Sequence, residues 1–371
     1  MATSGTVNTY VYSSAKIIDH GFRRAGLLRS MASAENVVIA QDLLFSILAE
    51  WVNAGTPLWT LEYQMLGITI GSPTVNTPAG TVDVRHAYWR ILNPYRGSAV
   101  GTDGTGATAL FGGASNADVV IAGPNPGVIV NFGTPSEIDT VGILLGAQAS
   151  FTAALNILVS TDGVTFTQAQ ALPSATYSPG QWVYFDLNPN LTFLAMQVQY
   201  TGGASWTLNQ INFGLANGQD IELGTLNLDD YYNLPDKSFR SSQPNSYYLD
   251  RQIVAPIIDI WPTPDSNAFY NGTVTSQFRR YVQDPGLLTN SVEIPTRAIE
   301  ALQWRLASRL IHEIPDDQAA QAQQSPYTAM AKQQKIQLIE QNATKSEMLF
   351  WAEERSRSPI KLSANISGYT R

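Results

Sequence analysis

Apolar side chains recur at helical spacing in the first 55 residues. Four of them predict a helix from about Ser13 to Leu28, namely Ile17, Ile18, Phe22 and Ala25. After a break at 29–32, Ser33 is placed to cap a second helix, whose apolar positions repeat every four residues at Ile39, Leu43, Ile47 and Trp51. Gly55 and Pro57 end it. Two short amphipathic helices cannot cover each other completely, so we expect another element or a neighbouring subunit to cover them.

The same periodicity returns near the carboxyl end. Pro295 stands at a first-turn position, and a stripe follows at Ala298, Leu302, Leu306 and Leu310 until Pro315 ends the helix. A longer helix is predicted from Ser325–Pro326, with apolar positions every seven residues at Ala329, Ile336, Ala343 and Phe350. Asn342 and Ser346 interrupt this seam, which favours an interface with other helices over an autonomous coiled coil. We expect the subunit interface to use Leu302, Leu306, Leu310, Ile336, Ala343 and Phe350.

The middle of the chain alternates apolar and polar residues with a period of two. Residues 58–94 turn extended, 97–106 are rich in Gly, Ser and Thr and predict a flexible linker, and 107–214 predict a β-sandwich. In the last strand of this segment the apolar phase shifts from Trp206 and Leu208 to Ile211 and Phe213, which indicates a bulge. Further short strands are predicted around 223–290.

Composition and charge narrow the classes of function. The chain has 371 residues, a length that favours two or three domains. Of these residues 44% are hydrophobic and only 14% are charged, and the low content of charged residues favours a protein that buries surface against partners. The net charge is −8, and the sequence has no run of Lys and Arg residues that could contact the phosphates of a nucleic acid. Sequence-specific DNA binding is therefore disfavoured. Residues 1–15 lack a signal-peptide pattern and no apolar run reaches membrane-spanning length, so we expect folding in a cytoplasm and no membrane contact.

Catalytic and metal-binding patterns are weak. The absence of cysteine excludes disulfides and thiolate chemistry, and His20, His86 and His312 lie in separate segments. No nucleophile elbow is present, although a Ser-His-Asp triad of distant residues stays open. Adjacent carboxylates such as Asp229–Asp230 point apart, whereas glycosidases need two across a cleft. We expect no enzyme activity, cofactor or metal; polysaccharide cleavage is the alternative to test.

The last residues differ in kind from the rest. From Arg355 to Arg371 the chain has four basic and no acidic residues, with apolar residues at a spacing that suits an extended strand. One interpretation is a disordered tail; the other is an arm that docks on a partner by strand addition. The docking candidates are Arg355, Arg357, Ile360, Lys361, Leu362, Ile366, Tyr369 and Arg371.

Several segments together resemble the head-to-tail adaptor family of tailed phages, also called tail accessory factors or packaged-DNA stabilisation proteins. The similarity spans roughly 1–95 and 220–356 in order and spacing. It is carried by 14–18 (SAKII), 21–26 (GFRRAG), 48–55 (LAEWVNAG), 231–238 (YYNLPDKS), 247–251 (YYLDR), 260–265 (IWPTPD), 292–295 (VEIP) and 298–302 (AIEAL).

The resemblance implies a structural role in a virion. Members form a dodecameric ring below the portal protein, extend the channel through which genomic DNA passes non-specifically, help retain that DNA, and carry a tail nozzle or tail tube protein below. It implies assembly in the host cytoplasm and a place at the head–tail junction. By position, it assigns portal docking to 357–371 together with Arg355.

The middle segment departs from the smallest members of that family. Val159–Phe166 (VSTDGVTF) and Met196–Tyr200 (MQVQY) resemble a discoidin-type jelly roll instead. Such a module either binds glycans, with Tyr177 and Trp206 as candidate contacts, or only braces a collar. Carbohydrate binding for attachment to a host surface is therefore the alternative function.

These observations combine into one expected architecture. The predicted fold class is α+β: an α-helical adaptor core with some β strands, formed by 1–97 and 219–356. An all-β jelly-roll sandwich is inserted at 98–218, and 357–371 form a carboxyl-terminal arm.

Overall fold

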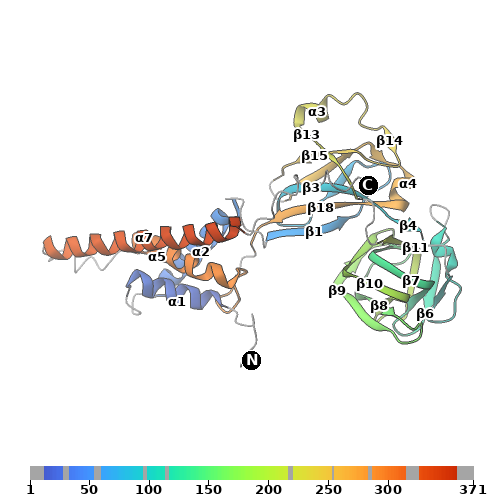
Figure 1. The fold of residues 1–371 in the computed structure, drawn as a ribbon, viewed down its shortest axis with the longest axis horizontal. Coiled ribbons are helices and arrows are strands. Elements are labelled where there is room, and N and C mark those ends of the chain that lie inside the picture. The colour runs from blue at the N-terminus through green and yellow to red at the C-terminus, as the bar shows by residue number, and fades with distance from the viewer. Residues whose placement is uncertain are drawn as a thin grey trace. The chain divides into compact units, whose positions relative to one another are not determined.

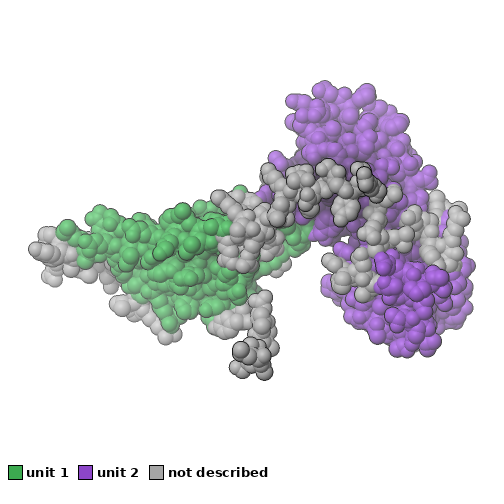
Figure 2. Space-filling model, in the orientation of Figure 1, with its two compact units in different colours: residues 1–62, 280–371 green, residues 63–279 purple. Residues whose placement is uncertain are grey.

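The computed structural model describes residues 12–27, 33–53, 60–94, 98–112, 117–215, 220–252, 255–282, 286–314 and 326–356. Contacts divide the chain into two compact units, one of 1–62 with 280–371 and one of 63–279 (Figure 2). We call the first the helical unit and the second the β unit. The amino- and carboxyl-terminal parts of the sequence thus fold together, while the β unit is built from the continuous stretch between them.

The helical unit is organised around α5 (Ile299–Glu313), which follows a short 3-10 turn, η4 (Thr296–Ala298). It packs against α1 (Ser14–Ala25), α2 (Ala34–Asn53) and α7 (Pro326–Ser356), as Figure 1 shows. These positions confirm the helices predicted at both ends of the chain. The backbone N–H of Asn36 donates to Ser33 Oγ at 3.2 Å, which confirms Ser33 as the cap of α2.

The helical stripes are covered inside this unit rather than left for a neighbour. Leu302, Leu306, Leu310, Ala343 and Phe350 are buried, and Ile336 is half-buried. The Phe350 ring stacks on Trp51 with 5.2 Å between centroids. The structure thus corrects the predicted interface set, because three helices packed around α5 bury what two helices could not.

The β unit contains an antiparallel sandwich whose two longest strands are β7 (Gly127–Leu145) and β10 (Trp182–Thr201). The other strands of its eight-stranded sheet are β4 (Asn93–Pro94), β5 (Ser98–Gly101), β6 (Val119–Ala122), β8 (Phe151–Ser160), β9 (Thr167–Tyr177) and β11 (Ser205–Leu215). They pair in the order β4-β11-β7-β10-β8-β9, with β5 on β7 and β6 on β11. A continuous apolar core fills the interior, together with the short turn η3 (Thr108–Phe111).

Two details of the sandwich test predictions made from the sequence, a bulge in the last strand and a flexible linker before the first. The register of β11 against β7 shifts between Leu208 and Gln210, and Trp206, Leu208, Ile211 and Phe213 are all buried, which confirms the predicted bulge. The predicted flexible linker at 97–106 is wrong for its described part. Ser98–Gly101 form β5, and the Asp103 carboxylate accepts the N–H groups of Thr105 and Ala122.

The rest of the β unit corrects the predicted fold class. Residues expected in an α-helical core form two four-stranded sheets and a two-stranded one instead. The first sheet contains β1 (Leu61–Leu66), β18 (Gly272–Arg280), β3 (Thr81–Ile91) and β12 (Asp220–Glu222). The second contains β13 (Gly224–Leu226), β15 (Ser246–Asp250), β16 (Ile257–Trp261) and β2 (Thr74–Asn76); β14 (Arg240–Ser241) pairs with β17 (Thr263–Pro264).

These sheets share one apolar core that includes Trp89, Tyr247, Ile260 and Phe278. The helices here are only α3 (Leu228–Tyr232) and α4 (Ser266–Asn271), each a single turn or slightly more, among the described residues. Strand therefore predominates, because 58–94 and 223–280 alternate with a period of two and their Pro and Gly residues interrupt longer helices. The division at residues 62 and 280 also differs from the expected one at 97 and 219.

Within the described part of the chain, none of the helices combines the length and apolar character that crossing a membrane requires. No cluster of three or more His, Asp or Glu side chains suited to a metal ion occurs there either.

Candidate functional site

A pocket of about 540 Å³ lies inside the β unit, between its sandwich and its smaller sheets. One wall comes from β9, β10 and the residue before β10. The other comes from β1 and from the end of β2 with the two residues after it. This volume is within the range of small-molecule sites. We call it the β-unit pocket.

The wall is rich in neutral polar groups and in aromatic rings. Its amides are those of Gln64, Asn76, Gln170 and Gln181, and its rings are those of Tyr63, Trp182 and Tyr184. Asp186 is the single charged side chain among the described residues that line it. Neutral amides, hydroxyls and aromatic rings suit a polar ligand.

The strand register explains why three of these residues face the pocket together. Trp182, Tyr184 and Asp186 alternate along β10, so they share one face of the strand. The Trp182 and Tyr184 rings lie 5.8 Å apart and nearly parallel, at 9°. The Trp182 ring also packs edge-on against the Phe269 ring of α4, with 6.0 Å between the ring centroids, and this contact holds the Trp182 ring in place. The aromatic part of the wall is therefore fixed before any ligand arrives.

Three polar atoms of the wall residues are enclosed without a partner. The indole N–H of Trp182, the hydroxyl group of Tyr184 and the amide oxygen of Gln170 have no hydrogen-bond partner among the described residues. Trp182 is only 6% exposed. Because an unsatisfied buried polar group is costly, residues that carry one are candidates for a functional role.

The two sides of the pocket are joined by direct contacts. The Asn93 and Phe213 backbones pair where β4 meets β11, and the Gln210 and Asn212 side-chain amides both donate to the Tyr270 carbonyl. Arg90 on β3 donates to Thr140 Oγ1 on β7 at 2.8 Å. These links come from backbone and from buried side chains, so they fix the shape of the pocket.

Electrostatics beside the pocket are set by carboxylates. Arg90 forms two hydrogen bonds of 2.7 Å with Asp220, and this pair raises the pKa of Arg90. Burial, with Asp220 nearby, raises the pKa of Tyr63 to about 12. Burial also raises the pKa of Asp139, although Arg90 opposes it. Arg90 is thus committed to Asp220, and the remaining carboxylates leave negative charge around the pocket.

The predicted glycan contacts are not in this pocket. Trp206 and Tyr177 both belong to the apolar core of the sandwich, where Trp206 meets Tyr200 at 6.1 Å and Tyr177 meets Phe151 at 5.6 Å. Both rings are buried there, with Trp206 0% and Tyr177 5% exposed. Trp182 and Tyr184 alternate in the sequence within the segment 107–214 that predicts the sandwich. What the sequence did not indicate is that β1 and β2 lie opposite them.

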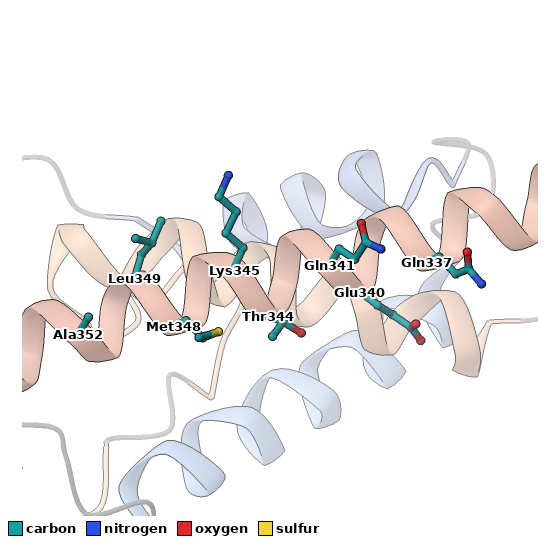
Figure 3. A pocket seen from close by; sticks show the side chains of 8 residues that line it. All are labelled: Gln337, Glu340, Gln341, Thr344, Lys345, Met348, Leu349 and Ala352. Atoms are coloured by element: carbon teal, nitrogen blue, oxygen red, sulfur yellow. The ribbon is translucent and has the colours of Figure 1, made fainter.

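A second feature lies on α7 in the helical unit. A hollow of about 880 Å³ is lined by eight described residues, all from α7 (Figure 3). Met348, Leu349 and Ala352 are exposed there, and we call these three the α7 patch. Because the described lining comes from one helix face, the hollow is a surface for a partner more than a site for a small molecule.

The predicted docking arm lies almost wholly outside the described residues. Arg357, Ile360, Lys361, Leu362, Ile366, Tyr369 and Arg371 fall beyond residue 356. Arg355 belongs to the last turn of α7. Portal docking by these residues stays a prediction.

Comparisons with known proteins identify no family. No family model matches the chain, and no curated protein does. Among solved structures, a family 32 carbohydrate-binding module of Clostridium perfringens NanJ, in complex with galactose, is 13% identical. It covers 34% of this chain and 98% of its own, with a TM-score of 0.28.

Two further carbohydrate-binding modules show a similarly low identity and TM-score. The module CpGH89CBM32-5 of Clostridium perfringens, in complex with GalNAc-β-1,3-galactose, is 16% identical over 33% of this chain and 98% of its own, with a TM-score of 0.28. Chitosan-binding module 1 of a Paenibacillus sp. IK-5 chitosanase/glucanase is 19% identical over 32% and 96%, with a TM-score of 0.27. Each similarity covers about a third of this chain.

Proposed function

We propose that this chain is a carbohydrate-binding protein and that the β-unit pocket holds the saccharide. The observation that carries the proposal is the composition of the pocket wall, where a fixed pair of aromatic rings stands among amides and hydroxyls. Saccharides present hydroxyl groups that pair with amides and C–H faces that pack on aromatic rings. A role in attachment to a polysaccharide surface follows from such binding.

The proposal is for binding without cleavage. Hydrolysis of a glycosidic bond uses two carboxyl groups on either side of the scissile bond. Asp186 is the single carboxylate among the described residues of the wall, so a second acid is missing from the described part of this pocket. A saccharide would bind there and be released unchanged.

Affinity electrophoresis of the full chain in polysaccharide gels tests the proposal. Retardation should weaken about tenfold for Tyr63→Ala, since removal of an aromatic ring from the wall of a binding site costs about 1–2 kcal/mol. Tyr281→Ala is the matched control, because Tyr281 is 47% exposed against 45% for Tyr63 and lies outside the pocket. Equal retardation of Tyr63→Ala and wild type, or no retardation in any polysaccharide, would contradict the proposal.

A second candidate function is the head-to-tail connector that the sequence resembles. The α7 patch favours it, because exposed apolar side chains on a helix suit a contact between subunits of a ring. In this account a dodecameric ring sits between the portal protein and a tail nozzle or tail tube protein, and surrounds the genomic DNA. The saccharide pocket would then belong to a virion protein.

Sedimentation velocity of the full chain tests the connector. Wild type should form a ring-sized species, and Met348→Asp with Leu349→Asp should shift it towards the monomer. Gln333→Glu with Gln334→Glu adds two charges at exposed positions of the same helix and is the control. A monomer at every concentration of the wild type would reject a ring that forms unaided through this patch.

A further inference from the structure

The charges around the β-unit pocket indicate which saccharides it takes, if it binds saccharides as proposed above. Asp186 is its one charged wall residue among those described, and no Lys, Arg or His joins it. A bound carboxylate, sulfate or phosphate would therefore meet a like charge and find no basic partner. Anionic saccharides are excluded on this ground.

The surroundings add to the negative charge instead of neutralising it. Asp139 and Asp186 interact electrostatically, as do Asp186 and Tyr63. Arg90 is the nearby cation, and its guanidinium is held by both oxygens of Asp220 and by Thr140. With Asp220 paired, the Asp186 carboxylate has no matching cation in the described wall.

The position of Asp186 relates this charge to the aromatic rings. It follows Tyr184 by two residues on the same face of β10, a separation of roughly 7 Å along the strand. That is about the length of one sugar ring, so a saccharide packed along the rings reaches the carboxylate with its next substituent. A protonated amine at that point would form a charge-assisted hydrogen bond with Asp186.

We propose that the β-unit pocket selects saccharides that carry a protonated amine, the amino sugars, over their N-acetylated counterparts and over acidic saccharides. Asp186 provides the selection. The aromatic rings and the amides bind all sugars that fit, whereas the carboxylate distinguishes between an ammonium group and a neutral acetamide. Asp186 is thus a specificity-determining residue.

Isothermal titration of the full chain with three oligosaccharides of equal length tests this proposal. The probes are oligomers of glucosamine, of N-acetylglucosamine and of galacturonic acid. We expect the glucosamine oligomer to bind about fivefold or more tightly than the acetylated one, because partly exposed ion pairs contribute modestly. The galacturonic acid oligomer should not bind. Added salt should reduce the preference.

Two variants separate the charge effect from binding itself. Asp186→Asn should remove the preference for the amine. Asp229→Asn, an exposed carboxylate on α3 outside the pocket, should leave that preference unchanged. Equal binding of amine and acetamide by the wild type, or a preference that survives in Asp186→Asn, would overturn the proposed selectivity. If no oligomer binds the wild type, the proposed function itself fails.

Discussion

Leu306 offers the sharpest test of whether the helical unit covers its own apolar stripe. Its side chain is fully buried in α5, and Gly21 of α1 lies against it. Leu306→Ala removes this packing and leaves a cavity, for which we expect a loss of about 3–4 kcal/mol in the free energy of unfolding. Leu338→Ala, at a side chain 57% exposed on α7, should change it by less than about 0.5 kcal/mol.

The close approach of α1 and α5 provides a second perturbation that is coupled to the first. A Cβ added at Gly21 would lie 2.9 Å from Leu306 Cδ2. Gly21→Ala alone should therefore cost about 1–3 kcal/mol by overpacking, against a gain of about 1 kcal/mol in helix propensity. In the Leu306→Ala background the new methyl group enters the cavity, so the same change should be stabilising there.

Urea unfolding followed by far-ultraviolet circular dichroism measures the four free energies, and hydrogen exchange in α1 and α5 identifies the unit affected. The reasoning is refuted if Leu306→Ala leaves unfolding unchanged and instead dissociates an oligomer. It is also refuted if the Gly21 and Leu306 effects simply add. The first result would mean that a neighbouring subunit covers the stripe, and the second that Gly21 and Leu306 do not pack against each other.

Three further predictions address the β unit and α7. Trp206→Ala should destabilise the sandwich by about 3–5 kcal/mol in thermal unfolding, because this ring is fully buried in its core; a small effect would contradict its assignment to the core. Asp139→Asn should stabilise the β unit at neutral pH. The raised pKa of Asp139 means that its ionised form opposes folding, so this gain should disappear as the pH falls below the usual aspartate pKa of about 3.8, and unchanged melting at pH 7 would reject it. Removal of 357–371 should leave unfolding unaltered and weaken binding to a portal ring in a pull-down assay; undiminished binding would remove the docking role.

Helical segments were predictable because each carries its own periodicity. The stripe of α5 and the cap at Ser33 are local signals, and both led to helices with nearly the expected bounds. The strands of the sandwich and the bulge in β11 were predictable for the same reason. The prediction that a neighbouring subunit covers the apolar stripes was wrong, because burial depends on how many helices pack together within the chain.

The fold class was wrong where short strands pair over long sequence distances. β1 pairs with β18 some two hundred residues later, and β12 pairs with β3 across the whole sandwich. Strands as short as Asp220–Glu222 contain too few residues for an alternating pattern to be recognised in the sequence. The resemblance then placed these residues in a helical core.

The candidate site was less predictable than the elements that form it. Trp206 and Trp182 both stand in alternating strands, and the sequence does not distinguish the ring that faces the core from the ring that lines a pocket. The pocket wall at Tyr63 and Gln64 is joined to that of β10 by tertiary links, among them those at Arg90 and Tyr270. Such a juxtaposition is a property of tertiary structure.

Hydrogen exchange of the full chain, with and without a saturating glucosamine oligomer, tests most directly whether saccharides bind in the β-unit pocket. We predict added protection confined to 63–67, 76–78, 170–172 and 181–186, the backbone that lines the pocket. Protection at the turns 102–106 and 162–165 of the sandwich instead, or no protection at saturating oligomer, would contradict it.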